Sequence, residues 1–85
     1  MKIDYHKDFL KSFKKQPLKV KEKFKERQVL LEINEFDPIL NNHALKGKWL
    51  GYRSINITGD LRAVFKKESR NVIFVAIDSH SNLYG

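Results

Sequence analysis

The sequence contains no cysteine, which excludes disulfide bonds, thiol catalysis and cysteine-based zinc sites. It has no apolar run near the roughly 18 residues that a membrane-spanning helix needs. No apolar segment follows Met1, so no signal peptide is expected. Repeats and Gly/Ser-rich linkers are also missing. We therefore expect a soluble cytoplasmic protein in which residues 1–85 form one domain.

Acidic residues are in short supply. The chain has 17 Lys and Arg against 10 Asp and Glu, a formal charge of +7, which favours binding to polyanions. In the first half, Lys and Glu alternate at helical spacing, a pattern typical of a solvated helix face. Between His43 and Lys66 the only acid is Asp60, so this stretch is the better candidate for a polyanion-binding surface.

Two helices are predicted in the N-terminal half. Residues 6–15 place apolar side chains on one side with the 3.6-residue helical period. Pro17 ends this helix and suits the start of the next, over residues 18–34. The expected core side of the second helix carries Val20, Phe24, Leu30 and Leu31.

Residues 37–51 are expected to form a loop, and strands are predicted after it. Alternating or continuous apolar patterns mark residues 52–57, 61–66 and 72–77, and residues 2–5 read as a first strand. The expected fold class is α+β, with two N-terminal helices packed on one face of a mainly antiparallel four-stranded sheet.

The strand periodicity also predicts where polar side chains lie. Alternation in residues 61–66 turns Arg62 away from the helices. In the last strand, Asp78 and His80 share the phase of Val72, Phe74 and Ala76. His80 and Arg62 are therefore both expected at the open side or the edge of the sheet.

Four residues of the second half have the chemistry needed to cut RNA: His43, Asp60, Arg62 and His80. Metal-independent RNA cleavage needs a base for the 2′-OH, an acid for the departing 5′-oxygen and cations near the phosphate. Imidazole suits the first two roles because it titrates near neutral pH. Arg62, Lys46 and Lys48 could supply the positive charge.

Each of these residues also has an ordinary structural interpretation. His43 could cap or fill a loop, and His80 could be an exposed tail residue. Asp60 is a common type of turn residue, and Arg62 could pair with a carboxylate. His6 looks structural at a helix start, and Trp49 could be a core or rim aromatic. The histidines and aspartates lack the short spacing of metal motifs, so neither a metal nor a cofactor is expected.

Four short motifs, taken in their order along the chain, strengthen the catalytic interpretation. NHALKGKW at 42–49, GYR at 51–53, GDLR at 59–62 and SHSNLYG at 79–85 resemble toxins of the RelE/ParE superfamily, most closely the YafQ-like branch. The resemblance implies a type II toxin that cleaves mRNA, typically on the ribosome, and forms a hetero-oligomer with an antitoxin that neutralises it. The free toxin is expected to be a monomer.

The resemblance also implies residue roles. His80 matches the general acid, His43 or Asp60 the base, and Arg62 a phosphate-stabilising arginine. RNA contacts are expected from Lys46, Lys48, Trp49, Arg53 and Tyr84. Asn56 stands where relatives often have another histidine, and Ala76 lies where they have an arginine.

Two alternatives remain open. One is a ParE-like toxin that acts on DNA gyrase without nuclease activity, although such proteins generally lack the histidine pair. The other is a catalytically inactive relative that only binds RNA.

Overall fold

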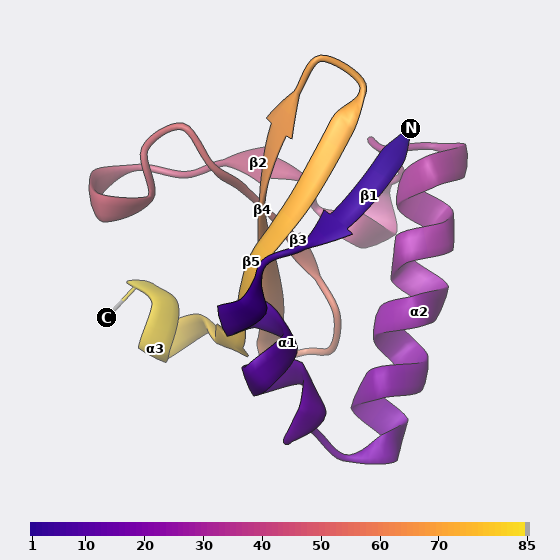
Figure 1. Cartoon of the computed structure of the whole chain (residues 1–85), viewed down its shortest axis with the longest axis vertical. Coiled ribbons are helices and arrows are strands. Elements are labelled where there is room, and N and C mark those ends of the chain that lie inside the picture. Colours follow the sequence, from indigo (N-terminus) through magenta and orange to yellow (C-terminus); the bar gives the residue numbers. More distant parts are fainter. Residues whose placement is uncertain (85) are drawn as a thin grey trace.

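A computed structural model of the chain describes residues 1–84 (Figure 1). The N-terminal half contains β1 (Lys2–Tyr5), α1 (Lys7–Lys14) and α2 (Leu18–Ile33). A connecting segment follows, with the 3₁₀ turn η1 (Pro38–Leu40), β2 (His43–Ala44) and the 3₁₀ turn η2 (Gly47–Trp49). The C-terminal half contains β3 (Arg53–Asn56), β4 (Leu61–Glu68), β5 (Asn71–Ser79) and α3 (His80–Tyr84).

The sheet has five strands in the order β1-β5-β4-β3-β2. β1 runs parallel to β5, and the other neighbours are antiparallel. The expected α+β class is confirmed, but the expectation of four strands is wrong. The additional strand is β2, in which His43 and Ala44 pair with Ser54 and Arg53. Two residues are too few to show a strand periodicity in the sequence.

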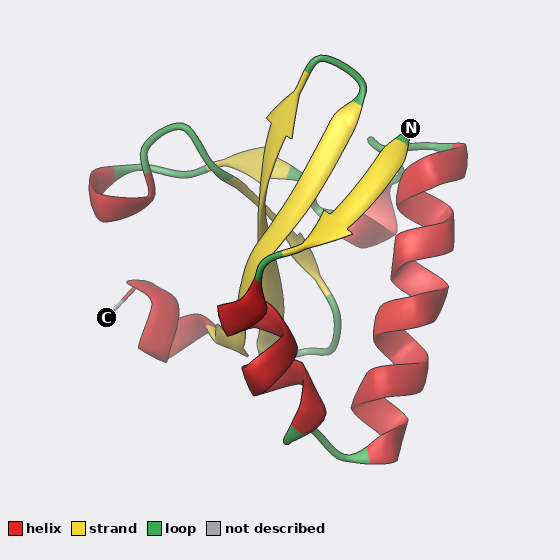
Figure 2. Ribbon diagram, viewed as in Figure 1, coloured by secondary structure: helices red, strands yellow, loops and turns green. Residues whose placement is uncertain are grey.

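The two long helices lie where the sequence predicts them (Figure 2). His6 precedes α1, and its Nδ1 accepts a hydrogen bond from the backbone N–H of Asp8, so its structural role is confirmed. Pro17 precedes α2, where its fixed φ suits a helix start and its missing N–H costs nothing. Both helices cover the same face of the sheet.

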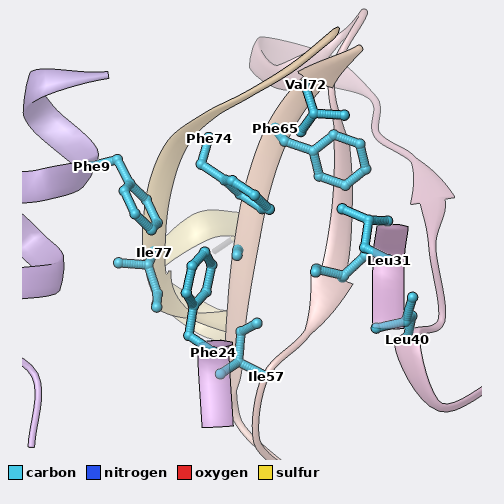
Figure 3. Close-up of a cluster of buried hydrophobic side chains, with 11 residues drawn as sticks. Phe9, Phe24, Leu31, Leu40, Ile57, Phe65, Val72, Phe74 and Ile77 are labelled. Carbon is cyan, nitrogen blue, oxygen red and sulfur yellow. The ribbon is translucent and has the colours of Figure 1, made fainter. Parts of the chain in front are cut away.

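Aromatic side chains dominate the core between the helices and the sheet (Figure 3). Phe24 of α2 lies 5.2 Å from Phe9 of α1 and 5.0 Å from Phe74 of β5, measured between ring centroids. Phe65 of β4 lies 5.6 Å from Phe74. Leu31 of α2 is also buried in this cluster. The rigid sheet that carries the polar residues described below is anchored by this packing.

A β-bulge in β5 changes which side chains face the helices. Phe65 pairs with Phe74, whereas the preceding Val64 pairs with Ala76, so Val75 is an extra residue. The bulge reverses the alternation: Phe74 faces the helical core, and Ala76 packs on the opposite side. The expected common phase of Asp78 with Phe74 is therefore wrong, and Asp78 instead lies opposite Arg62.

A second, smaller apolar cluster covers the other face of the sheet. Leu45, Val64 and Leu83 are buried there, and Trp49 and Tyr84 pack against them. In Figure 1, α3 and the loop around η2 lie across the sheet from α1 and α2. This side carries the candidate site. None of the helices within residues 1–84 is long and apolar enough to cross a membrane.

Candidate functional site

Four of the residues singled out from the sequence line one surface hollow of about 260 Å³. His43 comes from β2, Lys46 from the segment after it, and His80 and Tyr84 from α3. We call this the histidine hollow. Both imidazoles are exposed, so a ligand can reach them. Residues 43 and 80 are far apart in sequence, and only the fold brings them to one place.

The proton on His43 is fixed by a hydrogen bond. Its Nδ1 lies 2.7 Å from the carbonyl oxygen of Asn41. Because a carbonyl oxygen can only accept, the neutral imidazole must carry its proton on Nδ1. The lone pair then sits on Nε2, as a general base requires. Asn41 adopts a left-handed conformation with φ of 46°, which asparagine tolerates better than most residues.

His80 is positioned through the short helix α3. Ser79 caps this helix, with its Oγ accepting from the backbone N–H of Asn82 at 3.2 Å. The Asp78 carboxylate accepts from the Ser79 backbone N–H and from the Asn82 side chain. The backbone N–H of His80 donates to the carbonyl oxygen of Asp60. These bonds hold the start of α3 against the turn between β3 and β4.

Tyr84 completes the histidine hollow. Its ring meets the His80 imidazole edge to face, with centroids 4.6 Å apart. Its hydroxyl is buried and has no hydrogen-bond partner among residues 1–84. Tyr84 also lines a second, adjoining hollow, so one aromatic ring forms a wall of both.

The second hollow has a volume of about 550 Å³. Its lining residues are Lys46, Gly47, Lys48, Trp49, Leu83 and Tyr84, and we call it the tryptophan hollow. The indole N–H of Trp49 donates to the carbonyl oxygen of Leu83 at 3.2 Å. This bond ties the loop around η2 to α3. Among the described residues, no acidic side chain lines either hollow.

Asp60 and Arg62 lie beside the histidine hollow but do not line it. Asp60 is exposed in the turn before β4 and contacts His80 through its backbone oxygen. The Nη1 of Arg62 donates to the carbonyl oxygens of Thr58, Gly59 and Leu61. The guanidinium therefore folds back onto its own turn.

Arg53 lies apart from the other predicted RNA-binding residues. It pairs with Phe65 across the sheet, which places it on the helical side. Its Nε donates to the Asn42 side chain at 2.8 Å, and its guanidinium lies over the Phe36 ring. These contacts support the strand edge at β2. Within residues 1–84, no three His, Asp or Glu side chains cluster in a way that could hold a metal ion.

Sequence reasoning missed the residues that support the two histidines. Ser79, followed three residues later by Asn82, has the pattern of a helix N-cap, and the one-turn helix α3 could have been predicted from it. Asn41 offered no such signal. Its contribution is a backbone oxygen, which any residue in that conformation would supply.

The fold is that of small bacterial toxins of the RelE/ParE type. YafQ from Escherichia coli strain BL21(DE3) shares 26% identity, with a TM-score of 0.78 over 98% of this chain and 97% of that one. In the E. coli DinJ–YafQ complex, the matching chain shares 25% identity, with a TM-score of 0.75 over 98% and 97%. The YoeB/ParE toxin from Agrobacterium tumefaciens shares the fold at 19% identity, with a TM-score of 0.76 over 94% and 99%.

The family itself follows from the whole sequence. A family model described as the YafQ toxin of bacterial type II toxin–antitoxin systems matches residues 1–85. The chain therefore belongs to the YafQ family of type II toxins, which confirms the resemblance seen in its motifs. A comparison with curated protein sequences finds no match.

Proposed function

We propose that this toxin is an endoribonuclease that cleaves mRNA on the ribosome. The observation that carries the proposal is the histidine hollow, where two exposed imidazoles, a lysine and a tyrosine meet. General acid–base catalysis of RNA cleavage needs two groups that exchange protons near neutral pH, and histidine is the side chain best suited to both roles.

In the proposed reaction, Nε2 of His43 takes the proton of the ribose 2′-OH. The 2′-oxygen then bonds to the adjacent phosphorus, and the bond from phosphorus to the 5′-oxygen breaks. The protonated imidazole of His80 gives its proton to that leaving oxygen. The products are a 2′,3′-cyclic phosphate and a 5′-OH. Lys46 is close enough to offset the negative charge that builds on the phosphate oxygens.

We assign supporting roles to the other two predicted catalytic residues. Asp60 acts as a positioning residue, because its backbone oxygen holds the His80 N–H. Arg62 lies outside the histidine hollow and would act beside Lys46 as a second positive charge. Its Nη1 is bound to turn carbonyls, and a positive charge at this turn also attracts the RNA backbone at longer range.

The proposal is tested with His80→Ala in a translation extract, with mRNA cleavage followed by primer extension. Because a positioned general acid contributes roughly 10²- to 10⁴-fold, cleavage should fall by about that factor. Ribosome binding should stay nearly unchanged. His80 is exposed, so the variant should fold, and its circular dichroism spectrum serves as the control.

Full cleavage by His80→Ala would overturn the assignment. The ParE-like alternative would replace it if the purified protein inhibited gyrase supercoiling and left translating mRNA intact. Growth arrest that persists with His80→Ala would favour a toxin that binds its target without cutting it.

We also propose that the toxin acts in the cytoplasm, is monomeric when free, and is neutralised by an antitoxin in a hetero-oligomer. The family is one of toxin–antitoxin systems, and the related E. coli YafQ was crystallised in a complex with DinJ. A groove of about 430 Å³ between α1 and α2 could bind an apolar segment of the antitoxin. Leu10, Val29 and Lys25 are among its lining residues. The net charge of +7 favours an antitoxin segment that is acidic as well as partly apolar.

A further inference from the structure

We propose that the tryptophan hollow binds the nucleobase next to the phosphate that is cut, with Trp49 as its stacking surface. This inference rests on the proposed RNA cleavage. It adds to that reaction a binding subsite that holds one nucleotide beside the cleavage point.

The position of the hollow is the first argument. It shares Lys46 and Tyr84 with the histidine hollow, so the two adjoin. A phosphate held near His43 and His80 leaves the neighbouring nucleotide beside Tyr84. That nucleotide needs a place for its base, and the tryptophan hollow is the adjoining space.

The chemistry of the lining is the second argument. Trp49, Leu83 and Tyr84 present aromatic and apolar surface, which suits the flat face of a base. Lys46 and Lys48 add positive charge, which suits the phosphates on either side of that base. The Lys48 Nζ lies 5.9 Å from the centroid of the Trp49 ring, so charge and stacking surface occur together.

The rigidity of Trp49 is the third argument. Its indole N–H is bound to the Leu83 carbonyl, and its ring meets Tyr52 edge to face with centroids 5.5 Å apart. A ring held in this way binds a base with little further loss of side-chain freedom. Since its N–H is already used, Trp49 offers its face rather than a hydrogen bond. The subsite should therefore accept any base and favour purines for their larger stacking area.

Gly47 leaves part of the lining of the tryptophan hollow without a side chain. It has a φ of 62°, and an added Cβ would meet no atom within 4 Å. The positive φ is a conformation that favours glycine. The backbone there is bare, so a ligand can approach it closely.

Trp49 is the single tryptophan of the chain, so its fluorescence reports on this hollow alone. The test titrates the full-length protein with 2′-O-methyl tetranucleotides, which have no 2′-OH and cannot be cleaved. One oligonucleotide is intact, and two others each carry an abasic position on one side of the central phosphate. The intact one should quench Trp49. One abasic oligonucleotide should lose the quenching and bind on the order of 10- to 100-fold more weakly, as expected for the loss of one stacked base.

Variants separate stacking from charge. Lys48→Gln should weaken oligonucleotide binding more than Lys11→Gln does. The second variant removes the same charge from an exposed position on α1, away from the hollow. Trp49→Phe keeps a smaller ring, and Trp49→Ala keeps none, so affinity for a fluorescently labelled tetranucleotide should fall in that order. Circular dichroism checks the fold of Trp49→Ala. If that variant unfolds, Trp49→Phe and Lys48→Gln still decide the matter.

Equal quenching by the intact and both abasic oligonucleotides would overturn the inference, because the signal would then come from phosphate alone. Quenching by an antitoxin but by none of the oligonucleotides would also overturn it. The result does not depend on cleavage. If the His80→Ala variant still cleaved mRNA fully while one abasic oligonucleotide failed to quench Trp49, the proposed catalytic mechanism would be refuted and the base subsite retained.

Discussion

At the scale of single residues, the three histidines differ in which ring atoms are free. His6 uses Nδ1 as an acceptor for the Asp8 N–H and so serves the helix. His43 uses Nδ1 as a donor to the Asn41 oxygen, which leaves Nε2 for chemistry. His80 is tied through its backbone, which leaves its ring facing the hollow. The same residue type therefore has three different roles, decided by local hydrogen bonds.

This difference predicts opposite effects of matched substitutions. His43→Gln removes the proposed base, so RNA cleavage should fall by roughly 10²- to 10⁴-fold, with little change in urea-induced unfolding. His6→Ala removes a helix cap, so the free energy of unfolding should fall by about 1 kcal/mol, with cleavage unchanged. Cleavage rates and urea titrations of the two variants check both halves. Loss of cleavage in His6→Ala at full stability would contradict the assignment.

At the scale of elements, α3 links the proposed catalytic group to the rest of the fold. It has only five residues, too few for an independently stable helix. Its attachment depends on the burial of Leu83, on the bond from Trp49 to the Leu83 oxygen and on the Asp78–Asn82 contact. It is therefore held in place by these contacts rather than by its own helical hydrogen bonds.

Leu83→Ala should loosen α3 without unfolding the sheet. The side chain is buried in the small cluster with Leu45 and Val64, away from the aromatic core. Amide hydrogen exchange should become faster in residues 80–84, while β4 and β5 keep their protection. RNA cleavage should fall together with this local protection. Equal acceleration of exchange throughout the chain would show that the two clusters unfold as one unit.

The helices were predictable from the sequence because their signals are local. Pro17 marks a helix start, and the apolar period of the second helix predicts that Phe24 and Leu31 are buried. The bulge at Val75 was not predictable, because nothing in an apolar run shows where one residue is skipped. Strand β2 was missed because it is held only by pairing with β3.

The candidate site was predictable in its residue types and only partly in its arrangement. The motifs pointed to His43, Lys46, His80 and Tyr84 by residue type, and the fold brings all four to one hollow. Arg53 and Arg62 do not join them, because each finds nearer acceptors: the Asn42 side chain for Arg53, and turn carbonyls for Arg62. Such competition depends on three-dimensional distances that sequence spacing does not give.

At the scale of the whole molecule, the two faces of the sheet offer different surfaces. The hollows beside α3 carry the histidines and lysines, whereas the helical layer carries the apolar groove between α1 and α2. The proposed RNA and antitoxin contacts can therefore be separated by mutation.

Leu10→Glu tests whether the antitoxin binds in the groove between α1 and α2. Leu10 lines the groove and is 48% exposed, so the variant should fold but place a charge against an acidic, partly apolar partner. Binding of the cognate antitoxin, measured by calorimetry, should weaken by at least about tenfold, the effect of roughly 1.4 kcal/mol. Leu18→Glu is the matched control, because Leu18 is exposed on α2 and does not line the groove. Unchanged binding by Leu10→Glu would contradict this location.

The extra residue at Val75 has a consequence for how the gene can change. The bulge makes Ile77 face the aromatic core and Asp78 face the opposite side. Deletion of this one codon would remove the bulge and leave a regular ladder in which Val64 still pairs with Ala76 and Ala63 with Ile77, so both orientations would be kept. An in-frame deletion of Val75 should thus leave the aromatic core and the placement of His80 unchanged. A coding sequence one codon shorter between Phe74 and Asp78 can therefore encode the same fold.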